Sequence, residues 1–388
     1  MRIGVPKEIK DNEYRVGLVP SSAAELVQHG HEVIVETGAG TGAGIDDAAY
    51  RDAGATLRDG PELIFETAEL IVKVKEPQPV ERSRLRPGQV LFAYFHLAPD
   101  ARQTQDLMRS GAHCIAYETV TSATGGLPLL TPMSEVAGRL APQVGAHCLE
   151  RPTGGRGVLL AGVPGVPAAE VVILGGGVVG THAATIALGM GANVIVADRD
   201  PEALRKIDLR FGSSVRTIFS TGAVIAELVK RADLLIGAVL VPGAKAPKII
   251  TREMLGLMKP GSVIVDVAID QGGYCESSKP TKHSDPTYVV DGIVHYCVTN
   301  IPGAVPRTST FALNNATLPF VLAIADKGWR EALRSDAHLR AGLNISDGKI
   351  TYPPVGKAHG LPVTRVEEVL ALCRVRRRSS GSLSSENN

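Results

Sequence analysis

Short apolar runs alternate along the chain with longer stretches in which apolar residues recur every three to four positions. The longer stretches predict helices, for example at 21–29 and 46–53, and Ser22 precedes Glu25 at the spacing of a capping box. Strands separated by helices are typical of βαβ units and a parallel sheet. In the first third of the chain the short runs predict strands at 2–5, 32–36, 70–74, 90–95 and 114–117.

The alternation continues beyond residue 130 and indicates a second α/β unit. Residues 134–150 carry apolar side chains at helical spacing, and their position predicts a connector between domains. After Pro306 the pattern is helical again, at 311–324 and 329–337, and we expect this part to pack on the first domain. The strands predicted for the second unit are 171–174, 193–197, 234–238, 263–267 and 288–290.

Length and composition narrow the class of protein. A chain of 388 residues favours two domains, and 42 glycines with only 4% aromatic residues favour an α/β protein with many tight turns. The 41 basic and 40 acidic residues leave a formal net charge of +1, which provides no field to attract nucleic acid or an anionic membrane. No apolar run predicts a membrane span or a signal peptide, so we expect a cytoplasmic protein.

The cysteines do not predict a metal site. Their number, five, is odd and they are scattered, which is typical of free thiols in a reducing compartment. The adjacent pairs His113-Cys114 and His147-Cys148 contain metal-ligand residues, but neighbouring residues rarely share one ion, and we expect no metal. Residues 374–388 are polar, basic and rich in serine, which predicts a disordered tail.

The strongest local motif is VVILGGGVVGTHAA, a G-x-G-x-x-G between a predicted strand and an Ala-rich helix. Gly175 permits the tight turn, Gly177 lets the backbone approach a pyrophosphate, and Gly180 lets the helix pack close to the strand. Unpaired N–H groups at the start of that helix would then point at the anion. A glycine-rich turn without a nucleotide is the alternative.

Asp198 ends the strand after this motif, where a carboxylate can accept hydrogen bonds from both ribose hydroxyls. The same carboxylate would repel a 2′-phosphate, so the sequence favours NAD over NADP. Arg199 stands next to it and could accommodate that phosphate, which leaves NADP as the alternative.

Four side chains are candidates for substrate binding and proton transfer. Arg15, Lys75 and His96 each lie at or just after the end of a predicted strand, and in open α/β sheets such ends face the ligand crevice. An arginine can grip a carboxylate, and a histidine can move protons near neutrality. Asp270 lies where a predicted strand ends, whereas Asp266 belongs to its apolar part and is expected to be structural. Taken singly, Arg15, Lys75 and His96 each have a structural alternative, as a surface arginine, a solvated lysine and a packed histidine.

Several long runs in one order make the chain resemble the alanine dehydrogenase family over about residues 1–370. They include MRIGVPKEIKDNEYRVGLVP, IVKVKEPQP, LFAYFHLAPD, PLLTPMSEVAGR, VIVDVAIDQGG and TNIPGAVPRTST. The resemblance implies an α/β fold with two Rossmann-like doubly wound domains joined by long connecting helices. The first, discontinuous domain would comprise residues 1–130 and 305–373 and bind substrate, the second, residues 131–304, would bind NAD, and six copies would form a homohexamer.

By matching position, the resemblance implies that Arg15 and Lys75 bind substrate and that His96 and Asp270 are the acid–base pair. Matching NAD contacts would come, besides the glycines of the motif, from Ser134, Val178, Val179, Asp198, Ser220, Val239, Leu240, Val267, Ala268, Ile269, Asp270, Lys279, Val298, Thr299, Asn300 and Ile301. The chain departs from the family at His182, where Asn is common, at Tyr274-Cys275, and at Ala203, where a basic residue often contacts the cofactor.

The implied activity is the reversible oxidative deamination of L-alanine to pyruvate and ammonia, with hydride transfer to NAD. One alternative is the NAD-binding component of a proton-translocating transhydrogenase, which has the same architecture but passes hydride between nucleotides. Another is a catalytically silent NAD-binding protein that acts as a sensor. Turnover of glyoxylate, serine or 2-aminobutyrate stays open.

Overall fold

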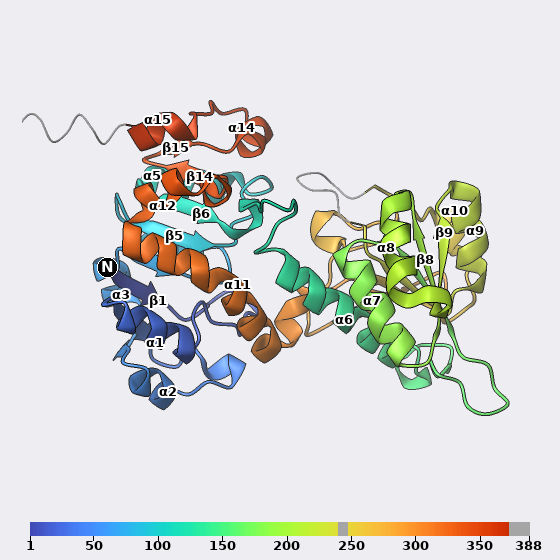
Figure 1. Ribbon diagram of the computed structural model, residues 1–388. Helices are drawn as coiled ribbons and strands as arrows, with labels where there is room; N and C mark the ends of the chain where they lie inside the picture. The colour runs from blue at the N-terminus through green and yellow to red at the C-terminus, as the bar shows by residue number, and fades with distance from the viewer. Residues whose placement is uncertain (240–246, 372–388) are drawn as a thin grey trace, which may run out of the picture. The chain divides into compact units, whose positions relative to one another are not determined.

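The computed structural model describes residues 1–239 and 247–371, and within them the chain forms two compact α/β units. Unit 1 combines Met1–Leu130 with the chain from Pro306 onward, and unit 2 is Thr131–Val305. Each unit contains one sheet with helices (Figure 1), so the predicted fold class and its two domains, the first discontinuous, are confirmed. The predicted tail, 374–388, lies outside the described residues.

Unit 1 begins with a run of alternating strands and helices. Its N-terminal part contains β1 (Arg2–Val5), α1 (Pro20–Gln28), β2 (Glu32–Glu36), η1 (Thr41–Ala43), α2 (Asp47–Asp52), β3 (Thr56–Arg58), α3 (Glu62–Thr67), β4 (Leu70–Val72), α4 (Pro79–Arg82), β5 (Val90–Ala93), α5 (Ala101–Ser110), β6 (His113–Ala116) and η2 (Tyr117–Thr119). Its C-terminal part contains α11 (Pro306–Lys327), α12 (Trp329–Ser335), α13 (Ala337–Arg340), β14 (Leu343–Ser346), β15 (Lys349–Ile350), α14 (Pro353–His359) and α15 (Val366–Ala371).

The unit 1 sheet has the strand order β15-β14-β6-β5-β4-β1-β2-β3. Strands β1 to β6 are all parallel and follow the doubly wound order 3-2-1-4-5-6, while β14 and β15 add an antiparallel edge. The order reverses between β1 and β4. Ligands of such sheets bind outside the carboxyl ends of the strands at this reversal, which places the candidate site of unit 1.

The C-terminal part of unit 1 is tied to its N-terminal part by α11, which packs beside α1 (Figure 1). Asn314 accepts from the Ser22 hydroxyl at 2.5 Å and from the Val19 N–H at 3.2 Å, and it donates to the Gly17 carbonyl at 2.7 Å. The predicted capping box at Ser22 is therefore wrong. Helix α1 begins at Pro20 with Val19 as its N-cap, because proline is already in the helical φ range and lacks an N–H to satisfy.

Unit 2 begins with a long helix and continues as a second alternating run. Its elements are α6 (Thr131–Cys148), η3 (Arg151–Thr153), β7 (Glu170–Leu174), α7 (Val178–Gly189), β8 (Asn193–Asp198), α8 (Pro201–Phe211), η4 (Gly212–Ser214), β9 (Val215–Phe219), α9 (Gly222–Arg231), β10 (Leu234–Gly237), α10 (Arg252–Leu255), β11 (Val263–Asp266), η5 (Ile269–Gln271), β12 (Thr287–Val290), β13 (Ile293–Tyr296) and η6 (Ile301–Ala304).

The unit 2 sheet has the order β12-β13-β11-β10-β7-β8-β9, in which only β12 is antiparallel to its neighbour. Its parallel strands repeat the 3-2-1-4-5-6 order, with the reversal between β7 and β10. Helices α6 and α7 pack side by side (Figure 1). A Cβ at Gly138 of α6 would stand 2.4 Å from the Val179 carbonyl oxygen, so their close approach depends on that glycine.

Side chains that could hold metals or cross-links are dispersed in the described ranges. Cys114, Cys148, Cys275 and Cys297 are buried free thiols. Over residues 1–239 and 247–371, no three His, Cys, Asp or Glu side chains gather as metal ligands. None of the helices in that part of the chain is both long enough and apolar enough to cross a bilayer.

Candidate functional site

Three of the predicted site residues lie at the carboxyl edge of the unit 1 sheet. Arg15 follows β1, Lys75 follows β4 and His96 follows β5, and these strands are consecutive neighbours in the sheet. Gly17 permits the long loop after β1 to fold onto the end of β4, because a Cβ there would stand 2.4 Å from the Val72 carbonyl oxygen. The sheet therefore brings together residues that are distant in the sequence.

Arg15 is held by a bidentate ion pair with Glu13. The Nε donates to Oε1 at 2.7 Å and Nη2 donates to Oε2 at 2.6 Å, and the two side chains are 1% and 0% exposed. Burial acts to raise the pKa of Glu13, but the hydrogen bonds and charge of Arg15 outweigh it and lower this pKa to about 2. The guanidinium is therefore fixed in orientation, and sequence reasoning missed its partner.

Lys75 and His96 both lie close to the aromatic ring of Tyr94. The Lys75 Nζ lies 6.0 Å from the centre of the Tyr94 ring, and the His96 ring stacks on it at 5.9 Å with an interplanar angle of 5°. The Tyr94 hydroxyl donates to the Leu129 carbonyl, and burial raises the pKa of Tyr94, which keeps the phenol neutral. Tyr94 thus provides an uncharged aromatic surface close to both a cation and an imidazole.

His96 is exposed and has an unusual backbone. Its φ is +51°, in the left-handed region that non-glycine residues rarely occupy. Its N–H donates to the Glu118 carboxylate at 2.7 Å, and the Phe95 N–H donates to the same oxygen at 3.1 Å. Such backbone conformations cost roughly 1–3 kcal/mol and persist where the surroundings hold them.

A buried charge cluster lies behind this edge. Lys73 is 1% exposed and donates to Glu8 at 3.1 Å and to Glu81 at 2.8 Å. Burial raises the pKa of Glu8 to about 7, although the charge of Lys73 opposes this shift. The other Glu8 oxygen accepts from the Val74 N–H at 2.7 Å, so the cluster fixes the backbone immediately before Lys75.

In unit 2 the three motif glycines lie between β7 and α7, and their geometry fits a dinucleotide. Gly175 has a φ of +107°, which only glycine adopts readily. A Cβ on Gly180 would stand 1.8 Å from the Gly175 carbonyl oxygen, whereas a Cβ on Gly177 would meet nothing within 4 Å. Gly180 therefore lets helix α7 pack closely against the turn, and the open space at Gly177 leaves room for a ligand against the backbone.

Asp198 ends β8 beside this turn. One of its oxygens accepts from the Gly176 N–H at 2.5 Å and the other from the Asp200 N–H at 2.8 Å. Each carboxylate oxygen can accept more than one bond, so Asp198 can still accept from ribose hydroxyls. Arg199 is exposed.

The remaining residues predicted to contact NAD follow the carboxyl ends of the unit 2 strands or line nearby turns. Ser220 follows β9, Val239 follows β10, 267–270 follow β11, and 298–301 follow β13 after one residue. Ser134 lies in the first turn of α6 and Lys279 lies in the loop before β12. Val178 and Val179 open α7. Leu240 lies outside the described residues.

The two aspartates of VDVAIDQGG have different surroundings. Asp266 is fully buried and accepts from the N–H groups of Ala268 and Tyr274, each at 3.0 Å, and from the Ser278 hydroxyl at 2.5 Å. Burial raises its pKa while these bonds oppose the shift. Asp266 thus organises the loop, whereas Asp270 is exposed on η5 at the carboxyl edge of the unit 2 sheet.

Comparison with known proteins identifies the family. The N-terminal domain model of alanine dehydrogenase/PNT matches residues 4–137, and the C-terminal domain model of the same family matches residues 141–353. The chain belongs to the alanine dehydrogenase/PNT family. The resemblance found in the sequence is thereby confirmed.

Relatives within this family match nearly the whole chain. A protein from Halomonas elongata named alanine dehydrogenase is 60% identical over 93% of this chain and 97% of its own length. A solved structure of an L-alanine dehydrogenase is 51% identical with a TM-score of 0.89, covering 96% of this chain and all of the other. A transhydrogenase structure from Sinorhizobium meliloti is 27% identical with a TM-score of 0.80, covering 90% and 100%. The similarity is therefore greater on the dehydrogenase side of the family.

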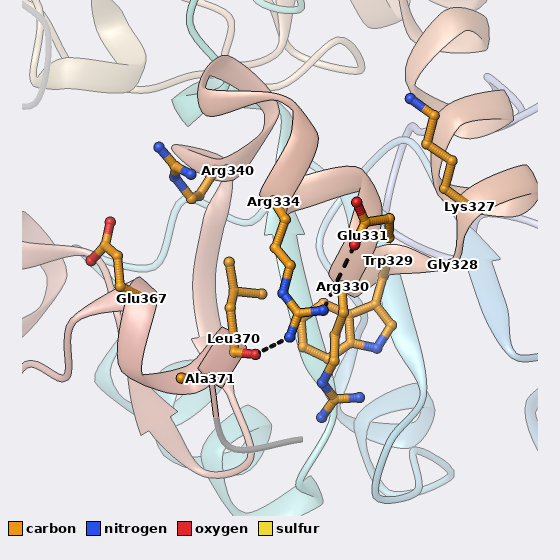
Figure 2. Close-up of a pocket in the computed structure, with 10 residues that line it drawn as sticks. All are labelled: Lys327, Gly328, Trp329, Arg330, Glu331, Arg334, Arg340, Glu367, Leu370 and Ala371. Atoms are coloured by element: carbon orange, nitrogen blue, oxygen red, sulfur yellow. Dashed lines mark hydrogen bonds and ion pairs between the residues drawn. The ribbon is translucent and has the colours of Figure 1, made fainter. Parts of the chain in front are cut away.

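A cavity of about 1030 Å³ also lies in unit 1 (Figure 2). Arg330 covers the Trp329 ring there at 4.3 Å, and Arg334 reaches the Leu370 carbonyl. The lining residues come from the end of α11 and from α12, α13 and α15, and they include none of the predicted site residues.

Proposed function

We propose that this chain is an NAD-dependent alanine dehydrogenase, which converts L-alanine, NAD and water reversibly into pyruvate, ammonium, NADH and a proton. The observation that carries the proposal is the 60% identity, over nearly the full length of both chains, to a protein named alanine dehydrogenase. The cationic edge of unit 1 and the dinucleotide fingerprint of unit 2 support it, because the reaction needs a carboxylate site and a nucleotide site.

Unit 2 would hold NAD. The backbone at Gly177 and the start of α7 would hold the pyrophosphate, and Asp198 would accept hydrogen bonds from the ribose hydroxyls. When bound, the nicotinamide supplies the hydride acceptor of the reaction. The remaining contacts would come from Ser134 and from the turns after β9, β10, β11 and β13.

Unit 1 would bind the substrate. Arg15 and Lys75 are cationic, nearly buried and held by neighbours, so they can grip a small carboxylate and polarise a carbonyl oxygen with little loss of side-chain entropy. The orienting partner of Arg15 is Glu13, and both Lys75 and His96 lie close to the ring of Tyr94.

His96 and Asp270 would move protons. After hydride has left the α-carbon, the resulting imine must add water, and a basic side chain is needed to take the proton from that water. The same group, once protonated, can return its proton to the departing nitrogen. His96 is the first candidate for both steps, because an imidazole can take up a proton and release it again, and Asp270 is the second candidate.

The test is a screen of 2-oxo acids with NADH, with and without ammonium. We expect NADH oxidation with pyruvate only when ammonium is present, and alanine as the product detected by NMR. Turnover of pyruvate without ammonium would indicate a hydroxy-acid dehydrogenase. Hydride exchange between NADH and an NAD analogue, with no response to pyruvate and ammonium, would favour the transhydrogenase component.

We also propose a cytoplasmic homohexamer that acts on small molecules, with alanine, pyruvate and ammonia as substrates and no nucleic-acid or membrane partner. The family resemblance supports the hexamer, and the near-zero net charge supports the absence of polyanionic partners. Size-exclusion chromatography with light scattering tests the assembly, and a monomer at assay concentration would contradict it.

A further inference from the structure

The chain between β5 and α5 turns sharply at His96. Strand β5 ends at Ala93, and Asp100 is the N-cap of α5, so the chain must reverse within residues 94–99. His96 has φ +51° at this turn. For a residue with a Cβ, such as histidine, this conformation costs free energy, and only glycine avoids that cost. Something outside the turn must therefore hold it.

The group that holds the turn is the carboxylate of Glu118. It lies on η2, which follows β6, and β6 is the strand next to β5 in the sheet. Its Oε1 accepts from the His96 N–H at 2.7 Å and from the Phe95 N–H at 3.1 Å, and its Oε2 lies 3.4 Å from the Phe95 nitrogen. Two consecutive N–H groups thus converge on one side chain from the neighbouring strand.

Among the described residues, the ring of His96 has one aromatic contact. It stacks on Tyr94, whose own ring also packs edge-on against Tyr117 at 5.0 Å. His96 as a whole is exposed, so burial does little to define the place of the imidazole. Its position is consequently set by the backbone turn, and the backbone turn is set by Glu118.

We propose that Glu118 is a positioning residue for His96: it holds the left-handed turn that presents the imidazole at the carboxyl edge of the unit 1 sheet. The proposal deepens the proposed function and rests on it for the role of His96. The length and orientation of the Glu118 side chain matter here, because the Phe95 and His96 N–H groups both donate to an oxygen at its tip.

Three substitutions separate geometry from charge. Glu118→Gln keeps an acceptor oxygen at the same reach but removes the charge, Glu118→Asp keeps the charge but shortens the reach by one methylene, and Glu118→Ala removes both. We expect Gln to retain kcat within about threefold, and Asp and Ala to lose roughly 10–100-fold, the scale of a 1 Å misplacement of a catalytic group. KM for pyruvate and the Kd of NADH should change little in all three.

Asp100→Ala provides the matched control. Asp100 is also a carboxylate that accepts a backbone N–H near His96, from Gln103 at 2.9 Å, but it does not touch the Phe95 or His96 amides. We expect kcat of this variant to stay within about threefold of the parent, since no reacting group would be displaced. An equal loss in Asp100→Ala and Glu118→Ala would show general loosening of the loop and overturn the proposal.

Other results would overturn it as well. Normal kcat in Glu118→Asp and Glu118→Ala would show that the turn needs no external acceptor, and an unchanged kcat with a raised KM would make Glu118 a substrate contact. If Glu118→Ala does not fold, the Gln and Asp pair still decides, because each keeps a polar side chain of similar size.

Hydrogen exchange separates failure of the proposal from failure of the proposed function. If the parent enzyme does not turn over alanine or pyruvate, the proposed function is wrong. The amides of Phe95 and His96 should nevertheless be protected in the parent and in Glu118→Gln, and exchange faster in Glu118→Ala and Glu118→Asp. Equal exchange in all four proteins would refute the positioning role itself.

Discussion

The ion pair between Glu13 and Arg15 gives the sharpest prediction about stability. Glu13→Gln removes the negative charge opposite a guanidinium that is 1% exposed and leaves the amide with one acceptor oxygen for two donor positions. The pKa of Glu13 lies at about 2 in the fold, against 4.5 for an ordinary glutamate. This lowering of the pKa corresponds to about 3 kcal/mol of folding free energy at pH 7.

The sign of the pH dependence follows from the lowered pKa. A carboxyl with a lower pKa in the folded state stabilises the fold fully above the unfolded pKa, and that stabilisation is lost as the pH falls through the folded pKa. The difference between parent and Glu13→Gln should therefore shrink from about 3 kcal/mol at pH 7 to roughly half of that at pH 3. Both values refer to unit 1, where the pair is buried.

The assay uses the single tryptophan of the chain, Trp329, which is buried in unit 1. Its fluorescence reports the urea unfolding of that unit separately from unit 2. Glu62→Gln is the control, because Glu62 also pairs with an arginine in unit 1 but is 68% exposed, and it should cost less than about 1 kcal/mol. A loss below about 1 kcal/mol for Glu13→Gln at pH 7, or the same loss at pH 3, would refute the reasoning.

Three further substitutions test the proposed roles. His96→Ala should keep NADH binding and lose about 10²–10⁴-fold in kcat, and near-normal turnover in a stopped-flow assay would count against His96 as the proton-transfer group. Asp198→Ala should weaken NAD binding and shift the kcat/KM ratio toward NADP; an unchanged ratio would contradict the ribose role. Gly180→Ala should lower the free energy of unfolding by roughly 1–3 kcal/mol, because its Cβ would stand 1.8 Å from a carbonyl oxygen, and an unchanged urea-unfolding midpoint by circular dichroism would contradict this.

The sequence predicted the core strands and the strand ends that carry the site. Predicted strands 2–5 and 32–36 coincide with β1 and β2, and the predicted strand at 90–95 ends two residues beyond β5. That overshoot has a physical cause: Tyr94 and Phe95 are buried like strand residues, but the chain has already left the ladder to make the turn at His96. Strands β3, β9, β13, β14 and β15 were not predicted. Some of them have few apolar residues, and β13, β14 and β15 belong to antiparallel hairpins.

What the sequence could not show are the partners that fix the site residues. Glu13 and Glu118 read as ordinary polar residues in the chain, yet both are acceptors for groups whose place in space the fold decides. Asn314 likewise lies 292 residues from Ser22 and replaces the local cap that the pattern suggested. The spacing of residues along the chain predicts hydrogen bonds between near neighbours in sequence. Contacts between residues far apart in the sequence depend on the strand order, which no short motif specifies.

The two units share one strand order but use its reversal point differently. In unit 2 only Gly175–Gly177 separate β7 from α7, so the N–H groups of the helix are available to a phosphate. In unit 1 residues 6–19 separate β1 from α1, and this loop folds back over the end of β4 and brings Arg15 there. Backbone groups suit a pyrophosphate that runs along a turn, while paired cationic side chains suit a small carboxylate that must be oriented. Loop length after the first strand would thus suit the two sheets to different ligands, and the fold alone would not distinguish them.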